Sequence, residues 1–289
     1  MARRATDSEQ AVAVEFESRR ARLCLFLAAT LWSLAGVFIK YLTLPALTIV
    51  FYRSFFASLF FAFFLKKSAS KPKVALLASM LSYTVAISAF VAANKITTAA
   101  NAIVLQYTAP MFVFLIIHFL FREKIAGHSW IALLCGMLGI AVICADSIAQ
   151  PEAAGVMVAL LSGLLFSFYM ISLRFLKEFH AATLTFLNNL ACCLFLLPFV
   201  WWQLSLSLHE GWIVAAMGVV QLGIPYWLFS KGLERVQLQE ASLIVLIEPV
   251  LNPIWVALAV GEVPSQATLI GGSLIVASLA FRHLWQWLH

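Results

Sequence analysis

The stretch of sequence from residue 99 to residue 124 reads AANAIVLQYTAPMFVFLIIHFLFREK. Its apolar part is long enough to cross a lipid bilayer as a helix, which takes about 20 residues. A proline, Pro110, stands near the middle, and a charged cluster closes the stretch. Because proline lacks a backbone N–H and clashes with the preceding turn, we expect Pro110 to kink or break this helix.

A second stretch near the C-terminus repeats this pattern. In the first stretch Pro110 precedes Glu123 by thirteen positions, and in the second Pro249 precedes Glu262 by thirteen positions. A shift of 139 residues lays one stretch on the other. The alternative is two unrelated spans that happen to share a proline. The matched spacing favours an internal duplication in which each copy covers about half of the chain.

The composition of the chain is typical of a membrane protein. Of its 289 residues, 63% are hydrophobic and 11% are charged, whereas soluble domains are about half apolar and about a quarter charged. The net charge of +6 does not indicate nucleic-acid binding, because it follows from where the basic residues lie relative to the membrane. The five cysteines lie in apolar runs without metal-ligand spacing, so we expect no disulfide, metal site or cofactor.

The apolar runs number ten, and the connections between them are mostly short. We therefore predict an all-α polytopic membrane protein with ten transmembrane helices. The runs lie at about 22–41, 45–65, 74–93, 98–120, 127–145, 153–173, 181–202, 212–231, 238–260 and 267–287.

A polar seam at 146–152 divides the spans into five and five. We predict one five-helix repeat over 22–145, a linker over 146–152 and a second five-helix repeat over 153–289. Residues 1–21 are a polar N-terminal segment, which is either a short surface helix or a disordered tail. Because five is odd, the two repeats insert upside down relative to each other. Inverted repeats are typical of transporters in which one part moves against the other around a central site, and we expect the two halves to move as rigid units.

The basic residues predict the orientation, because lysines and arginines stay on the cytoplasmic side. With the N-terminus inside, all but three of the 19 lysines and arginines fall on the inner side. Lys40 and Lys95 lie outside, and Arg53 lies within a span. This asymmetry predicts cytoplasmic N- and C-termini, a periplasmic linker and a location in the bacterial inner membrane.

Several short motifs lie within or beside the predicted spans. They are Leu31-Trp32-Ser33, Tyr52-Arg53, Ala109-Pro110, Arg122-Glu123-Lys124, Gly136 with Gly139, Glu248-Pro249, Gly261-Glu262 and Gly271-Gly272. With these motifs the chain resembles the ten-helix EamA branch of the drug/metabolite transporter superfamily, and it is similar in size and layout to amino-acid exporters of the YddG type. The resemblance implies a basket of ten helices around a central cavity, with the fifth and tenth spans at the periphery.

Arg53 is the most informative single residue. It lies about eight positions into the second span, which is ~12 Å deep at ~1.5 Å per residue. An arginine at this depth costs at least ~2.5 kcal/mol and normally faces protein or water with a partner. Arg53 either binds a substrate carboxylate in the cavity or has a structural role, in an ion pair or on backbone carbonyls freed by a kink.

Glu248 stands within the ninth span, directly before Pro249. A carboxyl group at this depth is a candidate proton carrier or a contact for a substrate amino group. The alternative is a packing role at the kink. Arg53 and Glu248 are lone opposite charges at similar depth, so they could also pair with each other.

Other polar and aromatic side chains within the spans could complete a binding cavity. Asn101 and Asn188 are amides inside apolar spans, and Tyr107 stands just before Pro110. Aromatic side chains suit bulky apolar groups, although in membrane proteins they often pack or lie at the interface. The predicted substrate-binding residues are Trp32, Arg53, Tyr83, Asn101, Tyr107, Tyr169, Asn188, Trp227 and Glu248, and the predicted kink residues are Pro110 and Pro249.

The sequence has no G-x-x-x-x-G-K-[ST] loop and no group of residues with catalytic spacing, so it predicts neither a nucleotide-driven pump nor an enzyme. We predict a secondary transporter that exports amino acids or similar small metabolites. Its expected partners are a small-molecule substrate and membrane lipid, without nucleic acid, and its expected state is a monomer or weak homodimer. A transporter of drugs and organic cations, or of nucleotide derivatives, fits the same fold as an alternative.

Overall fold

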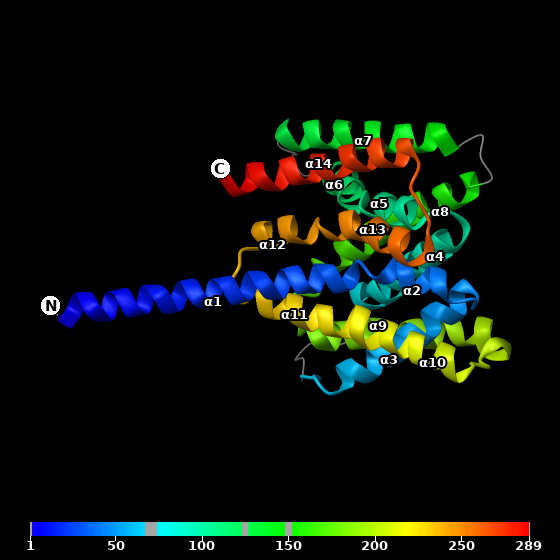
Figure 1. Cartoon of the computed structure of the whole chain (residues 1–289), viewed down its shortest axis with the longest axis horizontal. Coiled ribbons are helices and arrows are strands. Elements are labelled where there is room, and N and C mark those ends of the chain that lie inside the picture. The colour runs from blue at the N-terminus through cyan, green and yellow to red at the C-terminus, as the bar shows by residue number, and fades with distance from the viewer. Residues whose placement is uncertain (1, 67–73, 123–126, 148–151, 289) are drawn as a thin grey trace.

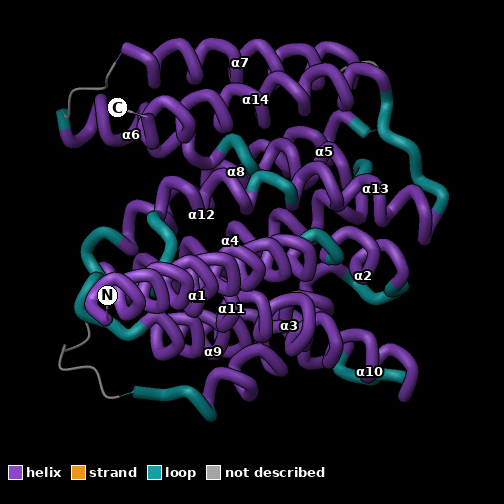
Figure 2. Tube along the Cα trace, turned by 60° about the vertical axis from the view of Figure 1, so that its left-hand side comes forward, coloured by secondary structure: helices purple, strands orange, loops and turns teal. Residues whose placement is uncertain are grey.

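The computed structural model of the chain describes residues 2–66, 74–122, 127–147 and 152–288. Every regular element in these residues is a helix (Figure 1, Figure 2). The elements, with a 3-10 helix η1 and a π-helix η2, are α1 (Ala2–Trp32), α2 (Ala35–Tyr41), α3 (Ala46–Ala62), α4 (Val74–Ile96), α5 (Ala99–Gln106), α6 (Ala109–Phe121), α7 (Gly127–Ser147), α8 (Ala153–Leu173), α9 (Ala181–Val200), η1 (Trp201–Gln203), α10 (Leu208–Ala216), η2 (Met217–Gly223), α11 (Ile224–Gly232), α12 (Leu238–Val245), α13 (Glu248–Val260) and α14 (Gln266–Leu288).

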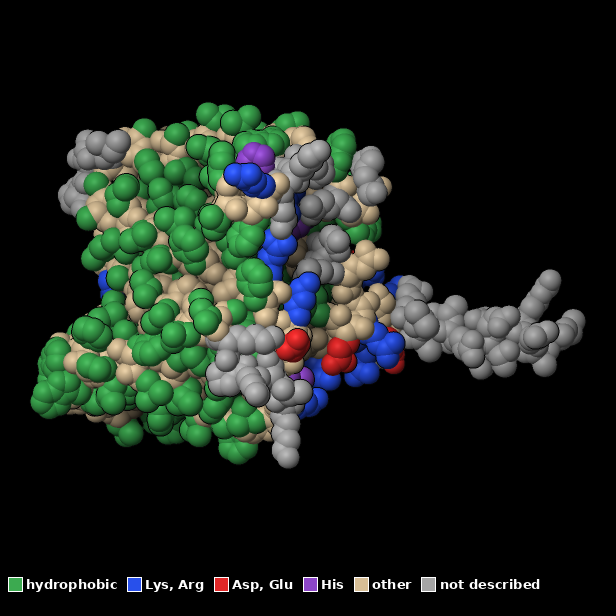
Figure 3. Space-filling view, turned by 180° about the vertical axis from the view of Figure 1, so that it is seen from behind, with side chains coloured by type: hydrophobic (Ala, Val, Ile, Leu, Met, Phe, Trp, Pro, Cys, Tyr) green, Lys and Arg blue, Asp and Glu red, His purple; other side chains and the backbone are tan. Residues whose placement is uncertain are grey.

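The helices match the predicted membrane spans. Nine stretches of the described chain are long and apolar enough to cross a membrane, and α3 is a shorter apolar helix. Together they follow the ten predicted spans in order and approximate position, so the predicted all-α membrane fold is confirmed. Figure 3 shows hydrophobic side chains over most of the visible face, with charged side chains gathered toward the end from which α1 projects. Such a surface suits lipid, and the chain is a multi-pass membrane protein.

The N-terminal segment is helical. α1 begins at Ala2 and runs without interruption to Trp32, so the segment over 2–21 is continuous with the first span and no element boundary lies at residue 22. Both termini lie at the same end of the bundle (Figure 1), as an even number of crossings requires. We call this end the terminal end, and the opposite end, where α2 ends and α10 begins, the far end.

Three spans each consist of two helices with a break between them. α5 gives way to α6 at Tyr107-Thr108, and α12 gives way to α13 at Leu246-Ile247. Pro110 and Pro249 stand in the first turn of the second helix in each case, where a missing N–H leaves no intrahelical bond unmade. A third break, at Ser33-Leu34 between α1 and α2, has no proline beside it.

The two sequence halves are interleaved in the packing. α1 packs mainly against α11 and α12, and α2 packs mainly against α13, all from the second half. In the same way α8, which opens the second half, packs mainly against α4, α5 and α6 of the first half. α3 pairs with α9, and α7 pairs with α14 along one side of the bundle (Figure 1). Helices of both halves are therefore in contact throughout the bundle in this structure, and the movement of one half against the other stays a prediction.

The close approach of α7 to α14 depends on two glycines. A methyl group at Gly139 would lie 2.5 Å from the backbone carbonyl oxygen of Gly271, and one at Gly271 would lie 2.5 Å from that of Gly139. Neither carbonyl can withdraw unless the helices separate. Small residues at such crossings allow two helix backbones to approach closely in a membrane, and here they serve packing inside the molecule.

We expect Gly139→Ala to lower the thermal stability of the purified protein, because the added methyl group meets backbone rather than a flexible side chain. Overpacking substitutions in a packed interior typically cost ~1–3 kcal/mol. Gly127→Ala, at the start of the same helix, is the matched control, since nothing lies within 4 Å of a methyl group there. Thermal unfolding in detergent measures both variants, and equal unfolding temperatures would contradict the role of the glycine contact.

Candidate functional site

Arg53 is buried in the bundle with two of its guanidinium nitrogens unpaired. It lies on α3 with 4% of its surface exposed, and its Nε and Nη1 atoms are buried with no hydrogen-bond partner. α3 approaches η2 so closely that a methyl group at Gly218 would lie 2.7 Å from the Arg53 carbonyl oxygen. This contact fixes the backbone that carries the side chain. Buried charged donors without partners are costly, so the site holds two unused N–H donors on a cationic side chain.

Glu248 opens α13 at the break of the ninth span. Its Oε2 accepts a hydrogen bond of 2.7 Å from the Tyr107 hydroxyl, and Tyr107 stands at the corresponding break of the fourth span. The same hydroxyl lies 3.3 Å from the carbonyl oxygen of Val245. The breaks of two equivalent spans, one from each half, are therefore joined at this carboxyl group.

Tyr226, on α11, interacts electrostatically with both charged groups, Arg53 and Glu248. Among the described residues Arg53 and Glu248 form no ion pair with each other, so the suggested direct pairing is wrong. The other tyrosines within electrostatic range of Tyr226 are Tyr83, Tyr107 and Tyr169.

Two aromatic pairs adjoin the charged groups. The Trp32 ring packs edge-on against Tyr226 with 5.0 Å between centroids, and Tyr83 packs against Tyr169 at 5.2 Å. Arg53 is within electrostatic range of one member of each pair, Tyr226 and Tyr83. Six of the side chains predicted from the sequence are thus brought together with Tyr226: Trp32, Arg53, Tyr83, Tyr107, Tyr169 and Glu248.

Asn188 belongs to the contact between α9 and α4. Its Oδ1 accepts a hydrogen bond of 3.1 Å from the Ser79 hydroxyl, and the neighbouring Asn189 accepts one of 3.2 Å from the Tyr83 hydroxyl. Both amides are buried. They hold α4 in place and orient the Tyr83 ring, so the structure gives Asn188 a packing contact beside the aromatic pair.

The side-chain hydrogen bonds of Asn101 involve none of the other predicted site residues. Its Nδ2 donates to the Thr97 hydroxyl at 3.1 Å, and its Oδ1 accepts from the Thr268 hydroxyl at 2.7 Å. Only 3% of its surface is exposed. Because both ends of the amide are used, Asn101 joins α5 to α14, and we leave it out of the proposed site.

The break in the first span is held by side chains that sequence reasoning missed. Gln221 Nε2 donates to the Trp32 carbonyl oxygen at 3.2 Å, and Asn252 Nδ2 donates to the Ser33 carbonyl oxygen at 2.9 Å. The Trp255 indole N–H donates to the Ser33 hydroxyl at 2.9 Å. Carbonyls freed at a helix break need such donors in a membrane. The sequence signal that could have identified these donors is the presence of amide side chains within apolar runs.

Trp227 and Tyr226 are neighbours that face differently. Trp227 is 41% exposed, and it lies ~100° round the helix from Tyr226, because an α-helix has ~3.6 residues per turn. Tyr226 contacts Trp32 and lies near both charged groups. The structure therefore brings Tyr226, the residue before Trp227, against Trp32, and a role for Trp227 in the site stays a prediction.

We expect Tyr226→Ala to reduce substrate flux by about tenfold or more, which corresponds to a loss of ~1.4 kcal/mol of interaction with the substrate. Trp227→Ala should leave flux near the parent value, because its side chain lies on the other face. Flux into proteoliposomes, normalised to the amount of protein inserted, measures both. A larger loss for Trp227→Ala than for Tyr226→Ala would reverse this assignment.

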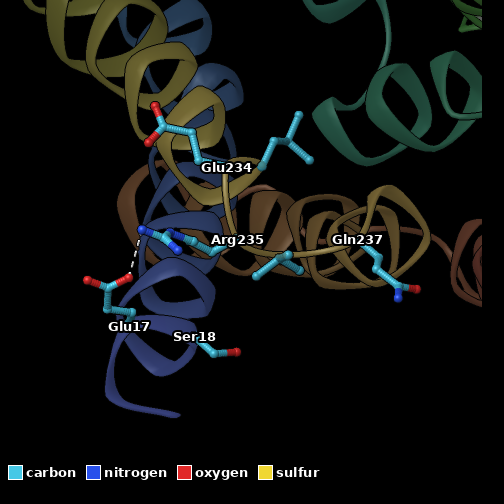
Figure 4. A pocket seen from close by; sticks show the side chains of 7 residues that line it. Glu17, Ser18, Glu234, Arg235 and Gln237 are labelled. Carbon is cyan, nitrogen blue, oxygen red and sulfur yellow. Dashed lines mark ion pairs between the residues drawn. The ribbon is translucent and has the colours of Figure 1, made fainter. Parts of the chain in front are cut away.

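An open pocket at the terminal end is separate from these residues. Figure 4 shows Glu17 and Arg235 joined across it by an ion pair of 2.9 Å. At its rim, the hydrogen bond of 2.8 Å from Lys231 holds the pKa of Glu234 below its ordinary value. The Glu17 and Arg235 side chains are more than half exposed, so this pocket is a charged surface feature.

Three proteins to which the chain is similar in sequence are named as transporters or exporters. A protein of Archaeoglobus fulgidus named as an uncharacterized transporter is 27% identical over 266 residues, covering 90% of this chain and 95% of the relative. The uncharacterized transporter YxxF of Bacillus subtilis is 26% identical over 259 residues, covering 85% and 83%. The pseudopaline exporter CntI of Pseudomonas aeruginosa is 27% identical over 248 residues, covering 82% and 85%.

The fold is also known. A solved crystal structure superposes with a TM-score of 0.66 at 20% identity, covering 92% of this chain and 97% of the other. At this identity the likeness concerns the fold alone. The EamA-like transporter family matches the chain twice, over residues 19–145 and 153–282. The family and the relatives are transporters, not enzymes. The chain therefore belongs to the EamA-like transporter family.

Proposed function

We propose that this protein is a secondary transporter that exports amino acids or similar small zwitterionic metabolites across the bacterial inner membrane. The observation that carries the proposal is a pair of opposite charges in the bundle interior that do not neutralise each other. Arg53 has two buried nitrogens without a partner, and the hydrogen bond that Glu248 accepts comes from the neutral hydroxyl of Tyr107.

A zwitterionic substrate would satisfy both charges at once. The planar guanidinium of Arg53 presents paired N–H donors that suit a carboxylate. Glu248 is an acceptor for the ammonium group, and Tyr226 interacts electrostatically with both residues. The aromatic pairs beside them suit the apolar part of the substrate.

In this proposal the substrate crosses the membrane by alternating access. Three broken spans meet in the interior, and broken helices around a central site are a feature of secondary transporters. The moving parts in this proposal are the interleaved packing groups, namely α1, α2, α11, α12 and α13 against α4, α5, α6 and α8. We assign the terminal end to the cytoplasm because lysines and arginines concentrate there, and a relative named as an exporter supports the outward direction.

The experiment is substrate flux in proteoliposomes. The panel contains labelled amino acids, a nucleotide sugar and a quaternary-ammonium dye, each measured with and without a pH gradient. Saturable amino-acid flux is the expected result, and liposomes without protein are the control. Flux of the dye without amino-acid flux would place the protein among organic-cation transporters, and flux of the nucleotide sugar alone would place it among transporters of nucleotide derivatives. Either result would overturn the zwitterion proposal.

A further inference from the structure

At the far end of the bundle, one carboxylate joins three elements. Glu262 follows Gly261, whose left-handed backbone (φ 78°) ends α13. Its Oε1 accepts a hydrogen bond of 2.6 Å from the backbone N–H of Ala99, the first residue of α5. Its Oε2 lies 2.5 Å from the ammonium nitrogen of Lys40 on α2. Glu262 thus binds the start of α5 and the end of α2.

Further contacts support this junction. Lys40 also donates to the carbonyl oxygen of Thr97 at 2.7 Å, and Lys95 donates to the carbonyl oxygen of Leu42. The side chains of Lys40 and Glu262 are only 16% and 21% exposed, so water screens the charges weakly. Hydrogen bonds to charged groups in such positions are stronger than neutral ones.

The junction crosses between the two packing groups. Lys40 lies on α2 and Glu262 follows α13, and these two helices pack on each other. Thr97 precedes α5 and Ala99 begins it, in the other group. The contacts from Glu262 to Ala99 and from Lys40 to Thr97 therefore tie one group to the other at the far end. Any separation of the groups at this end must break both.

Ion pairs at the terminal end are more open to water. Arg22 and Glu240 lie 2.6 Å apart with side chains 51% and 25% exposed. Arg235 and Glu17 lie 2.9 Å apart with side chains 63% and 54% exposed. Exposed pairs contribute little to stability. Both pairs also lie within one packing group, because they join α1 to α12 and to the segment after α11, so neither ties the two groups together.

We propose that Lys40, Glu262 and the first turn of α5 form a latch that holds the far end of the transport path closed and opens when the path opens to that side. This latch rests on the alternating access proposed above and adds the residues that control one end of it. The function of Glu262 is to bridge the packing groups, and Lys40 positions its carboxylate.

The first test does not need a substrate. A cysteine placed at Ala100, a buried position on α5, is labelled with a membrane-impermeant maleimide added at the far side, and the chain without this cysteine gives the background. Glu262→Gln should raise the labelling rate by roughly tenfold or more, because a charge-assisted contact is lost. Glu210→Gln is the matched control, since its carboxylate mainly caps its own helix through Ser207. Equal rates for Glu262→Gln and the parent would overturn the latch.

A second measurement tests the latch if the Glu262→Gln variant fails to fold. In the double variant Thr98→Cys with Glu262→Cys, a short, cleavable bifunctional thiol reagent links the two cysteines. Each single variant receives the same reagent as a control. Cross-linking should stop flux and keep the Ala100 position unlabelled, and cleavage should restore both. Flux that continues through an intact cross-link would overturn the latch. Absence of flux in the untreated parent would count against the proposed function instead, and the labelling result would still decide the latch.

Discussion

Replacing Arg53 with methionine should abolish amino-acid transport and leave the folded protein at least as stable as the parent. A buried arginine that served as a structural ion-pair partner would behave in the opposite way, because removal of one partner destabilises by ~3–5 kcal/mol. Here Nε and Nη1 have no partner to lose. Exchange of buried charge for an apolar side chain of similar volume is neutral or stabilising by up to ~4 kcal/mol.

The measurements are zwitterion flux in proteoliposomes and thermal unfolding in detergent. We expect flux to fall by roughly 100-fold or more, since truncation of one side of a buried charge contact costs ~2–5 kcal/mol and each ~1.4 kcal/mol is a factor of ten. Arg282→Met is the matched control, because this guanidinium stacks over the Phe114 ring at 4.0 Å. Arg282→Met should keep transport. Loss of stability together with retained transport in Arg53→Met would make Arg53 a structural residue.

Replacing Glu248 with glutamine should produce the second large effect, a loss of zwitterion flux of roughly 100-fold, because the ammonium group loses its counter-charge. The fold should persist, since the glutamine carbonyl can accept the same hydrogen bond from Tyr107 that the carboxylate accepts at 2.7 Å. Flux of a neutral analogue without the ammonium group should fall far less. Equal losses for the zwitterion and the neutral analogue would show that Glu248 does not bind the ammonium.

A double-mutant cycle separates binding from packing at this carboxyl group. Tyr107→Phe leaves Glu248 without its donor, and an unsatisfied buried polar group costs ~1–3 kcal/mol, so this variant should be less stable than Glu248→Gln. Additive effects on stability in the double variant would mean that the two residues do not interact. Glu234→Gln is the control, because its pair with Lys231 is exposed and surface pairs contribute little.

Hydropathy alone located the helices. The expected span at 153–173 coincides with α8 (Ala153–Leu173), and the expected span at 238–260 coincides with α12 and α13 together. The bilayer requires each crossing to satisfy its own backbone hydrogen bonds, so the length of an apolar run decides the element. Prolines at equivalent places also predicted two of the three breaks.

The third break could not be read from the sequence. Ser33 and Leu34 carry no helix-breaking signal, and the break persists because Gln221 and Asn252 supply donors from the second half. These donors are ~190–220 positions away in the chain, so only the folded structure brings them to the carbonyls. The same holds for the latch, in which Glu262 meets Lys40 and Ala99.

The direction in which individual side chains point from their helices was the least predictable feature. Sequence reasoning selected Trp227, whereas the structure places Tyr226 against Trp32, and it selected Asn101, whose amide is used between two helices. In a soluble protein, polar and apolar stripes mark the buried face of a helix. In a membrane, lipid is as apolar as the protein interior, so the inner and outer faces of a span carry similar residues.

The sequence by itself therefore determined the membrane fold, the ten crossings, the repeat and the two charged residues within the spans. Only the tertiary structure decided that the halves interleave, that Arg53 and Glu248 form no ion pair, and that a carboxylate ties the far end. The physical reason is that hydrophobicity and helix length act within one span, whereas helix packing and buried hydrogen bonds depend on which spans become neighbours.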